Sequence, residues 1–320
     1  MTRKAAAFLG TYPRHVVKTL LGKDFEVRIE DVDFGEADYL FFSESDPDHH
    51  AARPDVVKIY ITGENTCPDF NATDYALSSE YLTLGDRHCR FPYYASNDAA
   101  LGLNARPALT LDDLKAKPKF CNFIYSNHKL ADPIRDAFFH DLNRLRPVSS
   151  AGRHLRNDET LAQDTNPDWA FAKRRFMEGF RFTIAFENSA HPGYTTEKLT
   201  DALIARTIPI YWGDPLVGDE FNTEALLHIR EFPDTKDVIA RIEELESSPE
   251  LMLQVLNAKP CSRDLVLEHR QSARAFLERI LDQPKEAARR RPGYGRALGL
   301  EKKRRRDQTG WMRRFRKNRF

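Results

Sequence analysis

The chain has 320 residues, of which 41% are hydrophobic and 30% charged, and its formal net charge is +1. These fractions are typical of a soluble globular protein, and the length suits two domains of ordinary size or one large domain. No run approaches the ~20 consecutive apolar residues of a membrane-spanning helix, so we expect none.

The N-terminal end lacks the pattern of a secretory signal. Only residues 5–9 are apolar before the sequence turns polar, which is too short for a signal-peptide core. The four cysteines, Cys67, Cys89, Cys121 and Cys261, form no CxxC pair, so zinc and redox motifs are unsupported. A disulfide is compatible with the sequence, but free thiols in a reducing cytosol are the simpler interpretation. We therefore expect a cytoplasmic protein.

The first hundred residues alternate short β-rich runs with helical segments. Strands are predicted at residues 5–9, 39–43, 56–61 and 81–84, and a helix at residues 13–21. Residues 91–107 carry weak regular signals, which is typical of a linker between domains.

A second alternating set follows. Strands are predicted at 119–125, 182–186, 208–212 and 226–229, and helices at 111–115, 133–146, 167–178, 238–245, 251–256 and 265–281. Strands that alternate with helices indicate an α/β fold with largely parallel sheets. Two such sets predict two Rossmann-like domains, at residues 1–106 and 107–284, followed by a basic tail at residues 285–320.

Two charged residues lie where such folds often place their chemistry. Glu64 follows the strand at 56–61, and Gly63 permits a sharp exit from that strand, but a solvated loop acid would have the same pattern. Arg135 lies in the first turn of the helix at 133–146, where a guanidinium can bind a diphosphate through two hydrogen bonds. A solvated surface arginine is the alternative interpretation.

Residues 182–215 form the most informative segment. They predict a strand, a polar loop, a helix that begins at Thr195 or Thr196, and a second strand. Ligands bind where such a strand ends and its helix begins, and a helix start favours an anion.

Five residues of this segment have the chemistry that a nucleotide-sugar requires, namely Glu187, Asn188, Tyr194, Glu197 and Lys198. They supply a cation for phosphate, carboxylates and an amide for hydroxyl groups, and a ring for stacking. The alternative is an ordinary βαβ unit with a polar loop.

The motifs of this segment are FENS at residues 186–189, YTTEK at 194–198 and PIYWGDP at 209–215. In this order they closely resemble the donor-site motif of the bacterial α-1,3-fucosyltransferases of glycosyltransferase family 10. The resemblance implies a GT-B fold, in which two Rossmann-like domains face a cleft. It also implies an inverting transfer of L-fucose from GDP-β-L-fucose to a hydroxyl, expected to be O3, of an N-acetylglucosamine or glucose unit. We expect that unit in a cell-surface glycan such as lipopolysaccharide O-antigen.

The resemblance also implies roles for individual residues. The block GENTCPDFN at residues 63–71 is similar to a family block whose glutamate is the proposed general base, which would be Glu64. The block IRDAF at residues 134–138 is similar to one whose arginine contacts the donor diphosphate, which would be Arg135. Catalytic roles are thereby implied for Glu64, Arg135, Glu197 and Lys198, and donor-binding roles for Glu187, Asn188, Tyr194 and Thr196. Glu187 could instead be a structural acid that orders its loop.

We expect no metal or other cofactor beyond the donor. Asp46-Pro47-Asp48 has the D-x-D pattern of metal-dependent glycosyltransferases, but these residues are also ordinary turn formers. The resemblance places this tripeptide in the acceptor domain, away from the donor phosphates. Lys198, Arg135 and the helix start at Thr196 would take the place of a divalent cation.

The C-terminal end is strongly basic. Residues 285–320 carry 15 Lys and Arg against 3 Asp and Glu, a net of +12, whereas the rest carries 34 against 45, a net of −11. Trp311 and Phe315 are four residues apart and thus on one helical face, beside basic residues that suit an anionic membrane surface. We predict peripheral association with the inner face of the membrane. A disordered tail and nucleic-acid binding are the alternatives, and the acidic body does not favour nucleic acid.

Two functions other than fucosyl transfer are also compatible with the sequence. One is another GT-B glycosyltransferase with a different nucleotide-sugar donor. The other is a non-enzymatic, basic-tailed protein that binds membranes or nucleic acid, although such a protein has no need for the motifs at residues 186–215.

Overall fold

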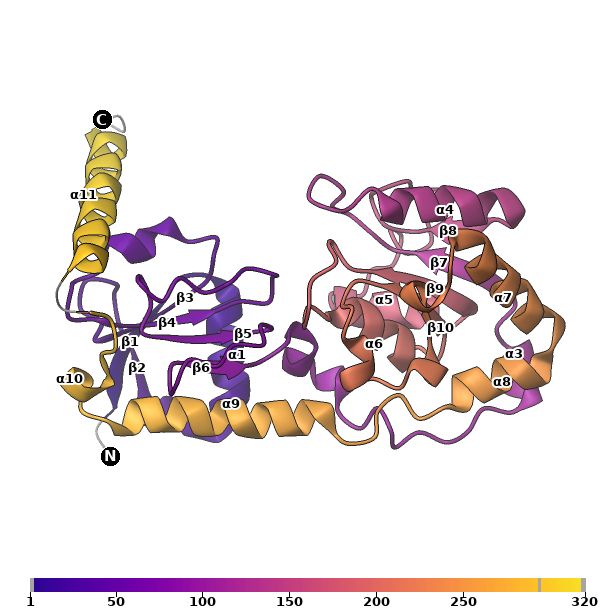
Figure 1. The fold of residues 1–320 in the computed structure, drawn as a ribbon, viewed down its shortest axis with the longest axis horizontal. Coiled ribbons are helices and arrows are strands. Elements are labelled where there is room, and N and C mark those ends of the chain that lie inside the picture. The colour runs from indigo at the N-terminus through magenta and orange to yellow at the C-terminus, as the bar shows by residue number, and fades with distance from the viewer. Residues whose placement is uncertain (1–2, 293–294, 318–320) are drawn as a thin grey trace. The chain divides into compact units, whose positions relative to one another are not determined.

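The computed structural model describes residues 3–292 and 295–317, with side chains described as far as residue 309. The chain divides into two compact units (Figure 1). The first unit comprises Met1–Ser96 and Leu267–Phe320, and the second unit comprises Asn97–Val266.

The first unit contains a six-stranded parallel sheet in the order β2-β1-β3-β4-β5-β6. The strands are β1 (Lys4–Phe8), β2 (Ile29–Asp31), β3 (Tyr39–Phe42), β4 (Val57–Ile61), β5 (Tyr75–Ser78) and β6 (His88–Arg90). The helices are α1 (Thr11–Leu21), α2 (Phe25–Arg28), α9 (Leu265–Asp282), α10 (Lys285–Ala288) and α11 (Arg296–Lys317), with a short 3-10 helix η2 (Pro47–Ala51). Strands β3, β4 and β5 are buried along their whole length, as expected for parallel strands covered on both faces.

The predicted strand at residues 81–84 is wrong. The chain instead forms β5 at Tyr75–Ser78, which pairs with β4 on one side and β6 on the other. Tyr81 and Leu84 are 47% and 42% exposed, because they lie in the connection between these strands. Residues 75–78 form the strand because they can be buried on both faces of the sheet, unlike residues 81–84. Local strand propensity does not predict this difference in burial.

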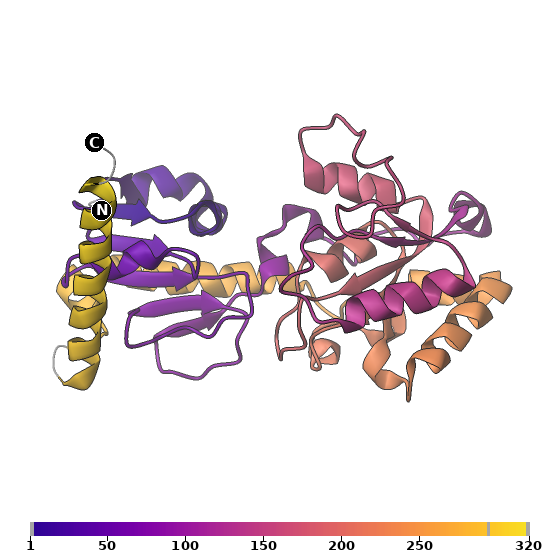
Figure 2. The same cartoon turned by 90° about the horizontal axis from the view of Figure 1, so that it is seen from above.

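The second unit contains a five-stranded parallel sheet in the order β11-β10-β9-β7-β8, with helices on both of its faces (Figure 2). Its strands are β7 (Lys119–Phe123), β8 (Val148–Ser150), β9 (Phe180–Phe186), β10 (Ile208–Trp212) and β11 (Leu227–His228). Its helices are α3 (Leu111–Lys115), α4 (Ile134–Leu145), α5 (Trp169–Met177), α6 (Glu197–Ile204), α7 (Thr235–Ser247) and α8 (Pro249–Asn257). The predicted strand–loop–helix–strand at residues 182–215 is confirmed as β9, α6 and β10.

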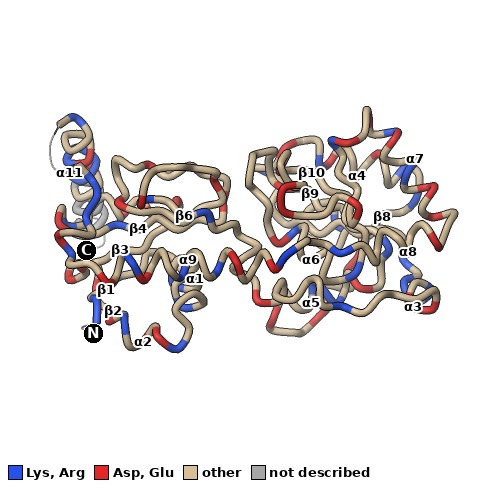
Figure 3. Tube along the Cα trace, turned by 60° about the horizontal axis from the view of Figure 1, so that its bottom comes forward, with Lys and Arg blue, Asp and Glu red and all other residues tan. Residues whose placement is uncertain are grey.

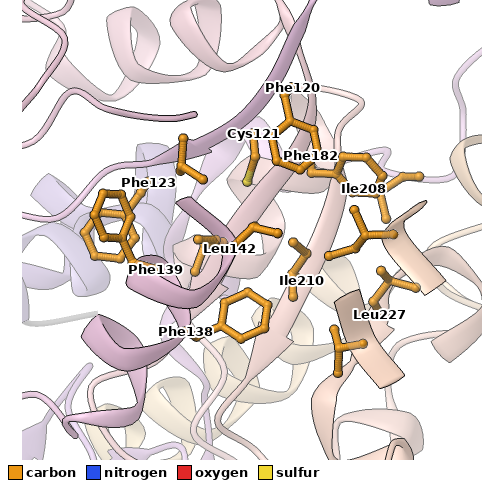
Figure 4. Packing of buried hydrophobic residues seen from close by; sticks show 14 of the residues in the cluster. Phe120, Cys121, Phe123, Phe138, Phe139, Leu142, Phe182, Ile208, Ile210 and Leu227 are labelled. Carbon is orange, nitrogen blue, oxygen red and sulfur yellow. The ribbon is translucent and has the colours of Figure 1, made fainter. Parts of the chain in front are cut away.

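One hydrophobic cluster holds α4 and α7 against this sheet (Figure 4). Phe138 and Leu142 of α4 pack with Phe182 of β9 and with Ile208 and Ile210 of β10, and all five side chains are buried. Each large buried apolar side chain contributes about 1.5–3 kcal/mol. This packing fixes the strand ends from which the loops described below emerge.

The units differ from the predicted division at residues 106 and 284. The chain leaves the first unit after Ser96 and returns to it at Leu267, within α9. Helix α9 belongs to the first unit because its side chains contact that unit directly. The Arg270 Nε donates to the Ala95 carbonyl at 2.8 Å, Arg274 pairs with Asp24, and the Phe276 ring packs edge-on against Tyr75.

The C-terminal residues also contact the first unit, as far as their side chains are described. Arg291 and Asp74 are both fully buried, with Nε and Oδ2 2.9 Å apart. The Glu301 carboxylate of α11 pairs with Arg291 and lies 3.3 Å from the Lys58 ammonium. Lys and Arg lie along α11 (Figure 3), but several basic residues of this region are engaged by acids of the first unit. The predicted Trp311 and Phe315 face lies outside the described side chains.

Candidate active site

The carboxyl edge of the second sheet gathers the loops with the predicted site residues. Strand β9 ends at Phe186 and is followed by Glu187, whereas β10 ends at Trp212 and is followed by Gly213. The parallel register pairs Phe186 with Trp212, so both loops begin side by side. This is the edge at which parallel α/β sheets bind ligands.

Glu187 is fully buried and holds the start of α6. Its carboxylate accepts hydrogen bonds from the backbone N–H and the hydroxyl of Thr196, both at 2.7 Å. Gly213 makes this placement possible, because a Cβ there would lie 2.4 Å from the Glu187 Cγ. These contacts are those of an acid that orders its loop, the second of the two roles considered for Glu187.

Lys198 lies between two carboxylates. Its ammonium is 3.3 Å from Glu187 Oε2 and 3.7 Å from Glu197 Oε1, and it donates to Thr196 Oγ1 at 3.1 Å. Burial disfavours the charge on Lys198, but Glu197 and Glu187 outweigh it and raise the pKa of Lys198 well above its usual value. Lys198 is therefore a permanent cation at the start of α6.

The two carboxylates are affected in opposite directions. Burial raises the pKa of Glu187, and the nearby Lys198 offsets this only in part. For Glu197, burial acts in the same direction but Lys198 and Lys173 outweigh it, so the pKa of Glu197 is lowered. Glu197 keeps 31% of its side chain exposed, whereas the side chain of Glu187 is fully buried.

Arg135 is positioned at the neighbouring strand end. Its side chain is 1% exposed and donates to the Asn127 carbonyl at 2.7 Å and to Asn188 Oδ1 at 3.3 Å. The guanidinium lies 4.2 Å from the centre of the Tyr125 ring, a cation–π geometry. The Tyr125 hydroxyl accepts from the Phe186 N–H at 2.7 Å, which joins this arginine to the end of β9. Two predicted residues, Arg135 and Asn188, are thus brought into direct contact.

Asp214 organises the loop between β9 and α6, a role that the sequence analysis missed. Its Oδ1 accepts from the N–H groups of Gly193 and Leu216 at 2.9 and 2.8 Å, and its Oδ2 accepts from the Thr195 hydroxyl at 3.2 Å. Gly193 has φ +83°, which a residue with a side chain adopts only with strain. Tyr194, between these anchored positions, is only 1% exposed. The turn residues Gly213-Asp214-Pro215 could be recognised in the sequence. The partners of Asp214, about 20 residues earlier in the chain, could not.

Asp201 anchors α6 from its other side and was also missed. It is 1% exposed and lies 3.0 Å from the Lys173 ammonium and 3.3 Å from the Arg174 guanidinium, both on α5. Because Asp201 and Lys198 share one short helix, this pairing also fixes the position of Lys198. The sequence signal was a lone acid in an apolar helix stripe, which is unusual unless the acid is paired.

Glu64 is described within the first unit. It follows β4, as predicted, and is exposed, and its backbone N–H donates to the Thr62 hydroxyl at 3.0 Å. That hydroxyl donates in turn to Glu44 Oε2 at 2.7 Å. Gly63 packs against Tyr93 so closely that a Cβ would lie 2.2 Å from the ring. The backbone that leads into Glu64 is therefore held in place, and Glu64 itself is an exposed residue.

The described residues contain neither a ready-made metal site nor a membrane-spanning helix. Among the described side chains, no group of three or more His, Cys, Asp and Glu residues is arranged to hold a metal ion. Within the same residues, no helix is both long enough and apolar enough to cross a membrane.

Comparison with known protein families gives two consecutive matches. Residues 8–96 match the family model described as Alpha-(1,3)-fucosyltransferase FucT N-terminal domain. Residues 114–263 match the model described as Glycosyltransferase family 10 (fucosyltransferase) C-term. Together the two matches cover most of both units.

Curated relatives agree with these matches over part of their length. The alpha-(1,3)-fucosyltransferase FucT of Helicobacter pylori is 31% identical in an alignment of length 234 that covers 63% of this chain and 47% of that protein. A putative fucosyltransferase of Acanthamoeba polyphaga mimivirus is 28% identical in an alignment of length 214 that covers 64% of this chain and 34% of the relative. The chain thus spans about half the length, or less, of these curated relatives.

Solved structures of similar proteins cover nearly the whole chain. A crystal structure of an alpha1,3-fucosyltransferase with GDP has a TM-score of 0.67 at 25% identity and covers 88% of this chain and 91% of that one. A structure of an alpha1,3-fucosyltransferase without a named ligand has a TM-score of 0.70 at 24% identity, covering 91% and 93%. The predicted GT-B fold, built from two Rossmann-like units, is confirmed.

Proposed function

Because the chain belongs to glycosyltransferase family 10, we propose that it is an α-1,3-fucosyltransferase that uses GDP-β-L-fucose as its donor. The observation that carries the proposal is the buried cluster of Glu187, Thr196 and Lys198 at the start of α6. A permanent cation beside a helix start is a site for a phosphate group. The arrangement of Arg135 and Asn188 at the adjacent strand end supports a second contact with the same diphosphate.

The donor side stabilises the leaving group in this proposal. As the bond between fucose and GDP breaks, negative charge grows on the β-phosphate. Lys198, the N–H groups at the start of α6 and the Arg135 guanidinium compensate that charge, and because they are fixed beforehand, little reorganisation is needed. Two protein cations then do the work of a divalent metal ion. Asn188, Tyr194 and Glu197 hold the ribose and fucose, and Glu187 keeps the helix start in place.

The acceptor side supplies the base. Glu64 takes the proton from the attacking hydroxyl, which then displaces GDP from the opposite face of the sugar and inverts the anomeric centre. The exposed carboxylate on a fixed backbone suits this role, because the acceptor must enter and leave at each turnover.

The acceptor we propose is an N-acetylglucosamine or glucose unit of a cell-surface glycan, fucosylated at O3. Lipopolysaccharide O-antigen is such a glycan, and it is assembled at the inner face of the membrane. We accordingly propose that the enzyme works in the cytoplasm, with the basic residues of α11 in contact with anionic lipid. Each Lys or Arg near that surface contributes about 1 kcal/mol.

The membrane contact is tested with a chain that ends at residue 309. This truncation keeps Arg291, Glu301 and Arg304, whose ion pairs hold α11 to the first unit, and removes Trp311 and Phe315. Sedimentation with vesicles containing phosphatidylglycerol should retain the full chain more strongly than the shortened one. Equal sedimentation of both chains would exclude a contribution of residues 310–320 to this contact.

The proposed reaction is tested by incubating the protein with GDP-fucose and an array of lactosamine, Lewis-precursor and chitobiose-core acceptors. Products are resolved by linkage, and parallel reactions contain GDP-mannose or UDP-galactose as the donor. Fucose transfer to O3 with GDP-fucose alone is the expected result. Transfer from another donor would favour the rival GT-B activity.

A further inference from the structure

A pocket in the first unit lies beside the loop of Glu64 and has no role in the proposed reaction. Its volume is about 320 Å³, at the lower end of the roughly 300–1,000 Å³ of small-molecule sites. Its walls come from the end of β3, from η2, from the loop after β4 and from α11. The lining residues used below are Glu44, His49, His50, Thr66, Cys67 and Arg304.

Two histidines of this pocket carry unsatisfied polar atoms. The Nδ1 atoms of His49 and His50 are buried and have no hydrogen-bond partner among the described residues. A buried polar atom without a partner is destabilising, so such atoms indicate a missing partner. Burial, then the nearby His50 and Lys58, lowers the pKa of His49 to about 2, so its ring is neutral.

The remaining walls combine flat rings with polar groups. The His49 ring stacks on Phe42 with centroids 4.0 Å apart, and Phe42 meets Tyr60 edge-on at 5.5 Å. The Tyr60 hydroxyl lies 2.7 Å from Thr66 Oγ1 and 3.4 Å from Glu44 Oε2. Apolar rings beside neutral imidazoles, hydroxyls and a carboxylate suit the apolar face and the hydroxyl groups of a sugar ring.

The charges of the pocket disfavour an ionic ligand. Arg304 of α11 lines the pocket, but its guanidinium is 2.6 Å from Asp69 Oδ2 and is neutralised by it. An anion such as a phosphate would therefore face the carboxylates of Glu44 and Asp69 without a free cation among the described lining residues.

Helix α11 is held over this side of the unit by two contacts. Arg304 pairs with Asp69, and Gln308 Nε2 donates to Asp48 of η2 at 2.6 Å.

The pocket and the proposed base share one hydrogen-bonded loop. The Thr62 hydroxyl accepts from the Glu64 N–H and donates to Glu44, a residue of the pocket wall. Thr66 lines the pocket two residues after Glu64, and two residues span at most about 7 Å. The pocket is thus adjacent to the proposed base, Glu64, which is not one of the pocket's lining residues.

We propose that this pocket binds a neutral sugar residue of the acceptor glycan, next to the residue that is fucosylated, and that α11 forms one wall of the site. This inference rests on the proposed function for the identity of the neighbouring sugar. It assigns α11 a role in acceptor selection, in addition to any contact with lipid. It also predicts that a disaccharide acceptor is preferred over the single sugar residue that is fucosylated.

Cys67 provides a direct test of occupancy in the full-length, unmodified protein. Cys67 lines the pocket and is exposed, whereas Cys89 is half-buried and Cys121 and Cys261 are buried. Alkylation by N-ethylmaleimide is followed by mass spectrometry with and without N-acetyllactosamine, and a Cys67→Ser variant reports labelling of the other thiols. At ten times the Kd of the disaccharide, the rate of Cys67 labelling should fall about tenfold. An unchanged rate at saturating disaccharide would overturn the proposal.

Kinetics of a His50→Ala variant give the second test. The KM for N-acetyllactosamine should rise about two- to tenfold, the effect of one lost hydrogen bond, while the KM values for N-acetylglucosamine and GDP-fucose stay unchanged. His15→Ala is the matched control, because His15 is an exposed histidine of α1 outside the pocket. Equal rises for both acceptors, or none, would contradict the pocket as an acceptor site.

The two tests separate this inference from the proposed function. If the protein transfers fucose but neither protection of Cys67 nor a KM shift is found, the proposed function stands and the pocket is not an acceptor site. Protection of Cys67 that His50→Ala weakens, in a protein that transfers no fucose, keeps the sugar pocket and removes the fucosyltransferase assignment.

Discussion

The two candidate half-sites, one at the carboxyl edge of each sheet, are built in opposite ways. In the second unit, Glu187 and Asp214 are buried and hold the loop and helix that carry Lys198. In the first unit, Glu64 is exposed, and the adjacent pocket leaves imidazole nitrogens without a partner among the described residues. The acids of the second edge are thus paired with the groups that they hold, whereas the acid of the first edge is exposed.

The largest expected effect separates chemistry from donor binding. Glu64→Gln keeps the size of the side chain but removes the base, so transfer should fall by about 10²–10⁴ while calorimetry finds unchanged affinity for GDP-fucose. Glu36→Gln is the control, because Glu36 is an exposed acid of the same unit. Near-normal turnover of Glu64→Gln would mean that another group is the base. The edge of the first unit would then not supply the catalytic carboxylate.

Lys198→Ala tests the preorganised edge. The variant loses a cation at the departing diphosphate and leaves the buried Glu187 without its ion-pair partner, so kcat should fall by about 10²–10³. Lys129→Ala, which changes an exposed lysine of the same unit, should retain full activity. If Lys198→Ala raised only the KM for GDP-fucose, Lys198 would bind the donor equally in the ground and transition states and would not stabilise the leaving group.

Asp214→Ala sharpens the comparison without touching the chemistry. Its removal leaves the N–H groups of Gly193 and Leu216 without their acceptor, so the free energy of unfolding should fall by about 1–3 kcal/mol. The loop would lose its order, and the KM for GDP-fucose should rise more than kcat falls. Urea unfolding and initial-rate kinetics measure the two effects. An unchanged KM would mean that the loop keeps its shape without Asp214.

Removal of metal ions is expected to have no effect on the rate of transfer. Because Lys198 and Arg135 provide the positive charge at the donor edge, treatment with EDTA followed by gel filtration should leave the rate of transfer unchanged. A rate that drops with EDTA and returns with Mg²⁺ or Mn²⁺ would assign part of this charge to a metal ion. The contrast between a self-sufficient donor edge and an open acceptor edge would then fail.

The sequence predicted the local features of the donor edge well. The run of β9, a cap at Thr195 or Thr196 and the strand at Ile208–Trp212 follow from local apolar patterns and turn residues. The structure contains both strands and has the cap at Thr196. Features that depend on distant partners were missed. Asp214 meets Gly193 across 21 residues and Asp201 meets Lys173 across 28 residues, so no local pattern reveals either pairing. The pocket could not be predicted for the same reason, because α11 and η2, which both line it, are more than 200 residues apart in the sequence.

The discontinuous first unit has a consequence for how the protein is made. During synthesis, all of Asn97–Val266 emerges before Leu267 and the rest of α9, so the second unit can fold while the first unit still lacks part of its own core. Until Arg291 arrives, Asp74 has no counter-ion for a carboxylate that ends up fully buried. The unit that carries Glu64 can therefore complete its core only after the whole second unit has been synthesised, although the first unit begins earlier in the chain.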